Sequence, residues 1–206
     1  MYRPARRIGE YGVMPDWPIA LRRATVDDLG LIVLLIEEAA EWLRDKGTDQ
    51  WARPWPSQAG RDSRIMSSLG QGKTWIGWDD AVPAATITAD PCEDPYWPDD
   101  LRREPAVYVH RLVVRRPYKG EGLGAELIDW AGWTAQRDHG AQWIRVSAWT
   151  TNGRLHEYYQ DQGFLPCGFH ADDGYPSGAR FQKPTAPMPT SGPGLFRVSW
   201  TPGLRG

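Results

Sequence analysis

The sequence predicts one α/β domain built on a mixed sheet. Three observations support this. The chain has 206 residues, enough for one domain with a sizeable core. Its apolar periodicity alternates between strand and helix in the order β-α-α-β-β-β-α-β-α-β-β. Near the middle, a β-branched strand runs through alternating glycines into a helix at 107–128.

The first half begins with a strand at 19–23. A helix follows, with Thr25 as its N-cap and acidic residues in its first turn, where the helix dipole favours them. A turn-rich link at 47–60 precedes a short helix at 61–69. The remaining elements of this half are a hairpin and a proline-rich surface loop, at 74–78 with 84–89 and at 90–105.

The second half carries the more regular patterns. Its predicted strands lie at 107–114, 143–149, 164–169 and 179–183. Its predicted helices begin at Leu123 and at Gly153, the second of them after an Asn cap.

The two ends of the chain differ from the predicted domain at 18–183. Residues 1–17 show no periodicity and are expected to form a flexible arm. Residues 184–206 form a Pro- and Gly-rich tail, in which 195–200 alternates and can add one edge strand.

Composition excludes several functions. A net charge of -2 gives no electrostatic case for nucleic acid or an anionic membrane surface. Cys92 and Cys167 have no metal-like spacing, and no apolar run approaches ~20 residues. The N-terminal basic residues are not followed by an apolar stretch, so we expect no secretory signal and a cytoplasmic protein.

The glycine loop Lys119-Gly120-Glu121-Gly122-Leu123-Gly124 predicts an anion site. Glycines allow a ligand to approach the backbone, and the free N–H groups of a helix N-terminus attract phosphate. No Lys-Ser/Thr pair follows, as a P-loop requires, and the Rossmann spacing fails after Gly124. A plain strand-to-helix turn is the alternative.

A second motif follows about thirty residues later. Asn152, Tyr159, Gly163 and Phe164 lie on a capped helix and its C-terminal turn. Together with the glycine loop, this pattern resembles the two motifs of the GNAT superfamily of acyl-CoA-dependent N-acyltransferases. Two departures are Lys119, where the family has Arg or Gln, and Leu155, where Ala is common.

The resemblance implies a twisted, mostly antiparallel sheet of six to seven strands with helices on both faces. It also implies acetyl-CoA as cofactor, with the pantetheine arm paired to the backbone of Leu112, Val113 and Val114. The pyrophosphate would lie on the amides of the loop and first helical turn, and Asn152 and Tyr159 would contact the cofactor. The implied loop residues are Lys119, Gly120, Glu121, Gly122, Leu123, Gly124 and Ala125.

The same resemblance implies the catalytic residues. Tyr159 would protonate the departing CoA thiolate, because a phenol of pKa ~10 is protonated at neutral pH; the alternative is a core tyrosine. His110 stands where many members carry a Glu base, and could relay a proton or only form a hydrogen bond. Tyr108, on the same strand face, is an alternative for positioning the acceptor.

For the acceptor, Trp51 and Trp55, with Trp42, predict a wall against an apolar or cationic substrate, or else a small satellite core. Asp90 and Glu93 could recognise a cationic acceptor. We therefore expect acetyl transfer to the primary amine of a small molecule by direct attack, in a monomer or homodimer. The alternatives are a non-catalytic acyl-CoA-binding module and an acetyltransferase acting on a protein amine.

Overall fold

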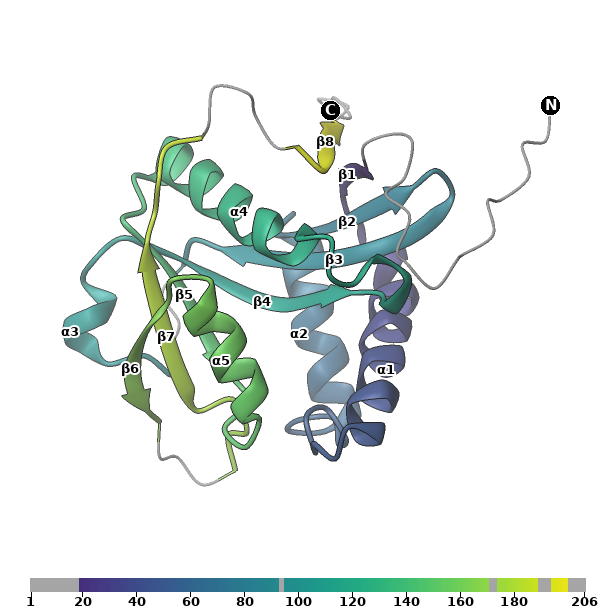
Figure 1. The fold of residues 1–206 in the computed structure, drawn as a ribbon, viewed down its shortest axis with the longest axis horizontal. Coiled ribbons are helices and arrows are strands. Elements are labelled where there is room, and N and C mark those ends of the chain that lie inside the picture. The colour runs from purple at the N-terminus through teal and green to yellow at the C-terminus, as the bar shows by residue number, and fades with distance from the viewer. Residues whose placement is uncertain (1–18, 93–94, 171–173, 189–193, 200–206) are drawn as a thin grey trace.

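A mixed sheet of eight strands organises the protein in the computed structural model, which describes residues 19–92, 95–170, 174–188 and 194–199 (Figure 1). The spatial order of the strands is β6-β7-β5-β4-β3-β2-β1-β8. Their bounds are β1 (Ile19–Arg23), β2 (Thr74–Asp79), β3 (Val82–Asp90), β4 (Ala106–Val114), β5 (Trp143–Ala148), β6 (Leu165–Phe169), β7 (Ala179–Pro184) and β8 (Phe196–Ser199).

Most neighbouring strands are antiparallel, and the exceptions are β4 with β5 and β1 with β8. The predicted fold class is therefore confirmed. The sheet has eight strands rather than six or seven because the C-terminal segment at 196–199 pairs in parallel with β1. The flexible arm predicted at 1–17 lies outside the described residues.

Helices cover both faces of the sheet (Figure 1). The α-helices are α1 (Leu29–Asp45), α2 (Gln58–Gly70), α3 (Asp99–Arg102), α4 (Leu123–His139) and α5 (Gly153–Asp161). Helix α2 begins earlier than the sequence predicted, because Ser57 caps it by accepting a hydrogen bond from the amide of Gly60. Helix α3 lies within the predicted proline-rich loop and was not expected.

Two core clusters hold these layers together. The larger contains the buried faces of α4 and α5 with residues of β1, β3, β4, β5 and β7. The smaller packs α1 and α2 against Ile76 and Val113 on the other face of the sheet. Among the described residues, none of the helices has the length and apolar character needed to cross a bilayer.

Strands β4 and β5 separate at their C-terminal ends, as Figure 1 shows. Their parallel pairing stops at Val109 and Val146, although β4 continues to Val114. The β5-facing edge of β4 beyond Val109 therefore has no strand partner in the described part of the chain. This opening in the middle of the sheet positions the site.

Candidate functional site

Two cavities meet where β4 and β5 separate. The first, here called the loop cavity, has a volume of 750 Å³ and lies between α1, the end of β4, the glycine loop and α5. The second, here called the aromatic cavity, has a volume of 480 Å³ and lies beside α2 and the middle of β4. Both volumes fall in the range of small-molecule sites, roughly 300–1,000 Å³.

The glycine loop forms one wall of the loop cavity as the sequence predicted. Gly122 has a φ of 80° and ends the loop directly before α4, a left-handed conformation that favours glycine. Gly124 is required for a different reason, because a Cβ there would lie 2.9 Å from the hydroxyl oxygen of Tyr158. The first amides of α4 have no intrahelical acceptor, so this wall offers donors and the positive end of a helix dipole.

The unpaired edge of β4 forms a second wall. Leu112, Val113 and Val114 all line the loop cavity. Just before them β4 carries one extra residue relative to β3, and Arg111 there has a φ of 49°. Such a left-handed conformation costs a non-glycine residue on the order of 1–3 kcal/mol and marks a local kink in the strand.

Aromatic and basic side chains surround the aromatic cavity. Tyr96 and Tyr175 stack with ring centroids 4.0 Å apart, and Trp55 meets Tyr175 edge-on at 5.1 Å. His110 and Trp149 line the same space. The predicted wall thus includes Trp51 and Trp55, whereas Trp42 lines the loop cavity and lies under the guanidinium of Arg116, 3.9 Å from the ring centroid.

A neck joins the cavities. It is formed by the five residues that line both of them. These residues are Gln50, Trp51, Leu112, Leu155 and Tyr159. The two cavities are therefore closest at these residues, and Tyr159, the predicted proton donor, is one of them.

The α1–α2 link is fastened to the start of α5 across the neck. The carboxylate of Asp49 accepts hydrogen bonds from Trp149 Nε1 at 2.9 Å and from Thr151 Oγ1 at 2.5 Å. These bonds lower the pKa of Asp49. Next to it, Asn152 Nδ2 donates to Gln50 Oε1 at 2.6 Å, while Asn152 Oδ1 accepts from the amide of Leu155. Asn152 is thus both a helix cap and a wall of the loop cavity.

Tyr159 is buried at the neck, with 8% of its surface exposed. Burial, with a further contribution from Tyr158, raises the pKa of the Tyr159 hydroxyl well above its ordinary value near 10. The hydroxyl therefore remains protonated throughout the neutral and moderately alkaline range, as a general acid requires. Tyr159 also packs against Phe164 and Phe181, so the core role considered for it holds as well.

His110 lines the aromatic cavity, and its pKa differs from that of an ordinary histidine. Burial and then the positive charge of Arg111 lower the pKa of His110 to about 4, against the opposing effect of Asp90. An unperturbed histidine titrates near neutrality, so this lowered pKa distinguishes His110 from its residue type. Its imidazole is neutral at physiological pH, available to accept a hydrogen bond and too weakly basic to deprotonate an alkylammonium by itself.

Of three further predicted residues, Tyr108 lies away from both cavities, Asp90 lines one of them but is already paired, and Glu93 is not described. Tyr108 is 2% exposed, packs against Trp97 and accepts a hydrogen bond from Arg145, so it lies outside both cavities. Tyr108 lies on the same strand face as His110, but at Tyr108 that face is covered by Trp97 and by Leu101 of α3. Asp90 lines the aromatic cavity but pairs with Lys73 at 2.8 Å, so it has a partner without any ligand. Glu93 lies outside the described residues.

The remaining residues of the loop behave as a group. Lys119, Gly120, Gly122, Leu123, Gly124 and Ala125 line the loop cavity, whereas Glu121 does not. Glu121 is the position in the motif between two glycines, where only the backbone is expected to matter.

Comparisons with known proteins agree with this geometry. The model of the acetyltransferase (GNAT) family matches residues 36–164, more than half of the chain. The chain belongs to the GNAT family of acetyltransferases. It is 31% identical over 152 residues to the uncharacterized N-acetyltransferase YesJ of Bacillus subtilis (strain 168), covering 72% of this chain and 82% of that protein.

Solved structures share the fold. A GNAT family acetyltransferase from Listeria monocytogenes 4b F2365 superposes with a TM-score of 0.63 at 22% identity, covering 81% of this chain and 94% of that one. The PaiA N-acetyltransferase of Thermoplasma acidophilum, solved in complex with coenzyme A, gives a TM-score of 0.58 at 15% identity over 82% of this chain and 99% of that one.

The protein is therefore an acyltransferase, and acetyl-CoA is its cofactor. The loop cavity fits this molecule: it offers unpaired amides for a pyrophosphate at Gly122–Ala125 and an open strand edge for the pantetheine at Leu112–Val114. The GNAT prediction and the predicted cofactor are thus confirmed.

Sequence reasoning missed much of the aromatic cavity. Gln50, Arg64, Tyr96 and Tyr175 come from links and from α2, and no local motif marks them. Only the density of tryptophans near residue 51 indicated that this region contacts a ligand.

Proposed function

We propose that the protein acetylates the primary amine of a small molecule, which attacks the acetyl thioester directly while both substrates are bound. The single observation that carries this proposal is the neck. Two cavities of suitable size share Tyr159 and four other residues in their linings, which supports a direct meeting of donor and acceptor without a covalent enzyme intermediate. Among the described residues that form the neck, none is a serine or a cysteine.

Acetyl-CoA supplies a thioester carbonyl whose leaving group is a thiolate. Tyr159 provides the proton for that thiolate, since its hydroxyl stands at the neck and its raised pKa keeps it protonated. The amides of the glycine loop and the edge of β4 fix the donor, which turns a bimolecular encounter into an oriented one.

The acceptor must reach the neck as a free amine, because an ammonium has no lone pair. An alkylamine of pKa ~10.4 is about one part in 10³ neutral near pH 7. The positive charges around His110, which lower its pKa, also act to lower the pKa of an ammonium placed beside it. Neutral His110 accepts a hydrogen bond from the free amine. The nitrogen becomes acidic only as the C–N bond forms and the C–S bond breaks, and its proton then passes through His110 to solvent while Tyr159 protonates the thiolate and regains a proton from solvent.

The test is release of the CoA thiol from acetyl-CoA in the presence of a panel of amines, with mass spectrometry of the products. We expect amine-dependent thiol release and N-acetylated product. We expect Tyr159→Phe and His110→Ala to reduce it, with CoA binding by calorimetry retained in His110→Ala. Tight CoA binding without turnover for any amine would contradict the proposal and support a non-catalytic acyl-CoA-binding module.

A further inference from the structure

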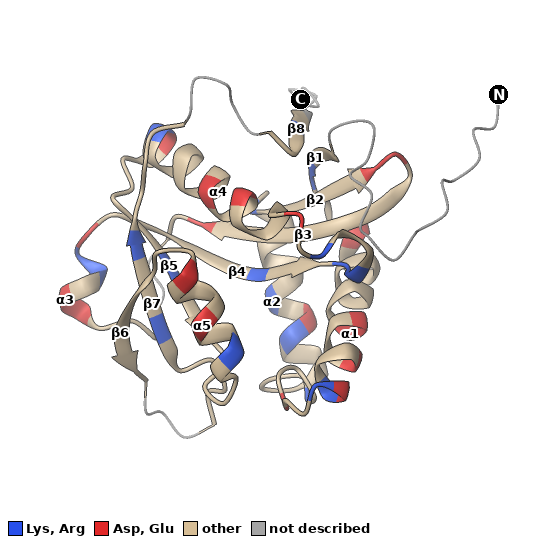
Figure 2. Ribbon diagram, in the orientation of Figure 1, with Lys and Arg blue, Asp and Glu red and all other residues tan. Residues whose placement is uncertain are grey.

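The charged side chains that line the aromatic cavity are mostly arginines. Figure 2 shows basic residues on both α2 and β4, the elements that flank this cavity. The lining set comprises four basic and two acidic residues. They are Arg53, Arg61, Arg64, Arg111, Glu37 and Asp90.

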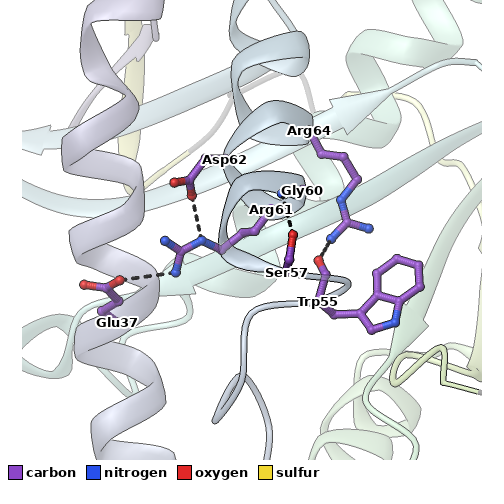
Figure 3. Close-up of polar contacts among 7 residues, drawn as sticks. All are labelled: Glu37, Trp55, Ser57, Gly60, Arg61, Asp62 and Arg64. Carbon is purple, nitrogen blue, oxygen red and sulfur yellow. Dashed lines mark hydrogen bonds and ion pairs between the residues drawn. The ribbon is translucent and has the colours of Figure 1, made fainter.

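Both acidic residues have cationic partners within the protein. Asp90 pairs with Lys73 at 2.8 Å. Glu37 on α1 pairs at 3.2 Å with Arg61, which also contacts Asp62 at 2.8 Å. Figure 3 shows Arg61 reaching from α2 toward α1 for these contacts. Both acids of the lining are thus engaged by other cations, although Asp90 lies close enough to Arg111 to raise its pKa in part.

Arg64 points the other way from α2, toward Trp55 (Figure 3). Its guanidinium donates to the carbonyl oxygen of Trp55 and lies 4.6 Å from the centroid of the Trp55 ring. Within the described ranges, no carboxylate lies within ion-pair distance of Arg64 or of Arg111. Arg64 is therefore held in place at the cavity wall while its charge is unpaired by any described acid.

Arg111 is the second such cation. One of its terminal nitrogens donates to Ser68 Oγ at 2.7 Å, while its buried Nε has no hydrogen-bond partner. Burial and then the nearby charge of Arg64 lower the pKa of Arg111 to about 10. Two neighbouring guanidinium groups, one of them partly buried, are costly without a counter-charge, because a cation withdrawn from water loses hydration that only an anion replaces well.

We propose that the acceptor amine carries an anionic group, a carboxylate or a phosphate, that binds between Arg64 and Arg111. This inference rests on the proposed function, since it names the class of acceptor. Guanidinium groups form paired hydrogen bonds with both kinds of anion, which an ammonium group cannot do as well. The same two cations disfavour a second ammonium group in the cavity, so polyamines are poor acceptors.

The test uses matched amines that differ in the distal group only. The set is 3-aminopropanoate, aminoethyl phosphate, 3-aminopropanamide and 1,4-diaminobutane, with L-phenylalanine against L-phenylalaninamide as an aromatic pair. Thiol release gives kcat/KM for each. A charge-assisted pair predicts a preference of roughly 10-fold or more for an anionic member over its neutral match. Comparing the propanoate with the phosphate then identifies which anion is bound.

Variants test whether Arg64 and Arg111 cause the preference for anionic acceptors. Arg64→Gln is expected to bring the anionic-to-neutral ratio close to 1. Arg137→Gln is the control, and it keeps the wild-type ratio because Arg137 lines neither cavity and pairs with Asp138. Arg111→Lys, which retains the charge but loses the paired geometry, is expected to lower the ratio partially.

The possible failures are distinguishable. Equal or better turnover of the neutral amides or the diamine would overturn the anion site while leaving acetyl transfer intact. Should no amine be acetylated, the proposed function fails, and calorimetry on the CoA-loaded protein decides the anion site. Tighter binding of 3-acetamidopropanoate or 2-acetamidoethyl phosphate than of 3-acetamidopropanamide, lost in Arg64→Gln, would support it. Equal binding, or none, would overturn it.

Discussion

The two cavities are built from different parts of the chain. The loop cavity takes its central wall from one continuous stretch, Leu112 to Ala125, and offers mainly backbone groups there. The aromatic cavity takes its lining from α1, α2, β4, β5 and the links around them, and offers mainly side chains. A site made of backbone is fixed by local chain geometry, whereas a site made of side chains changes with single substitutions.

This difference explains which properties of each cavity substitutions can change. Substituting a lining side chain at the edge of β4 leaves its N–H and C=O groups in place, so recognition of the common donor is robust. The aromatic cavity can change its charge or shape without disturbing the loop. Perturbations should therefore separate into effects on the donor, effects on the acceptor and effects at the neck.

The largest effect is expected at the neck. Tyr159→Phe removes the proton donor and should lower kcat by about 10²-fold or more, with smaller changes in either KM. Steady-state thiol release with both substrates varied measures this. Tyr158→Phe is the matched control, because Tyr158 lines only the loop cavity. An unchanged kcat in Tyr159→Phe would show that the thiolate leaves without this proton.

The second effect is expected on the free energy of unfolding, which should depend on pH through His110 in the aromatic cavity. Since the pKa of His110 is about 4 in the folded protein and about 6.5 when unfolded, its contribution to stability is fully present above pH 6.5 and is lost as pH falls toward 4. The loss amounts to about 3 kcal/mol of the free energy of unfolding.

Urea unfolding of wild type and His110→Gln between pH 7 and pH 4 measures that contribution. The groups facing His110 are Arg111 on its own strand, Asp90 on β3, Arg64 on α2 and Lys73 before β2. Burial acts to raise the pKa of Asp90, but its bonds with Lys73 and with the Cys92 amide lower it below the ordinary value, so the difference between the two proteins reports on His110. Identical pH profiles would contradict the lowered pKa of His110.

A smaller effect is expected in the loop cavity alone. Gly124→Ala places a Cβ 2.9 Å from the Tyr158 hydroxyl oxygen, and should raise KM for acetyl-CoA by roughly 10-fold through displacement of the loop. Tyr158→Phe in the same chain removes that oxygen and should restore most of the affinity. Gly30→Ala is the control, because the space around Gly30 is open. A raised acceptor KM instead would contradict the separation of the cavities.

The smallest effect is expected at the fastening of the α1–α2 link. Asp49→Ala removes the acceptor for Trp149 and Thr151, and should raise the acceptor KM a few-fold because the Gln50–Trp51 wall loosens. Asp49→Asn keeps one accepting oxygen and should lie between wild type and Asp49→Ala. A change confined to KM for acetyl-CoA would place this link on the donor side.

Sequence prediction succeeded where structure is local. The loop at 119–124 and the capped helix after Asn152 were both located, because a glycine at positive φ and an Asn cap act within a few residues. Prediction failed at Tyr108, since alternation along a strand gives the face of a side chain but not what covers that face. It also missed α3, whose four residues are too few to show a helical period.

The sequence alone determined the fold class, the order of the longer elements and the place of the glycine loop, because apolar periodicity and glycine spacing encode them directly. The tertiary structure alone decided the neck at Tyr159, the lowered pKa of His110 and the unpaired charges of Arg64 and Arg111. Those properties depend on groups that lie tens of residues apart, up to 102 between Asp49 and Thr151, and on the water that their packing excludes.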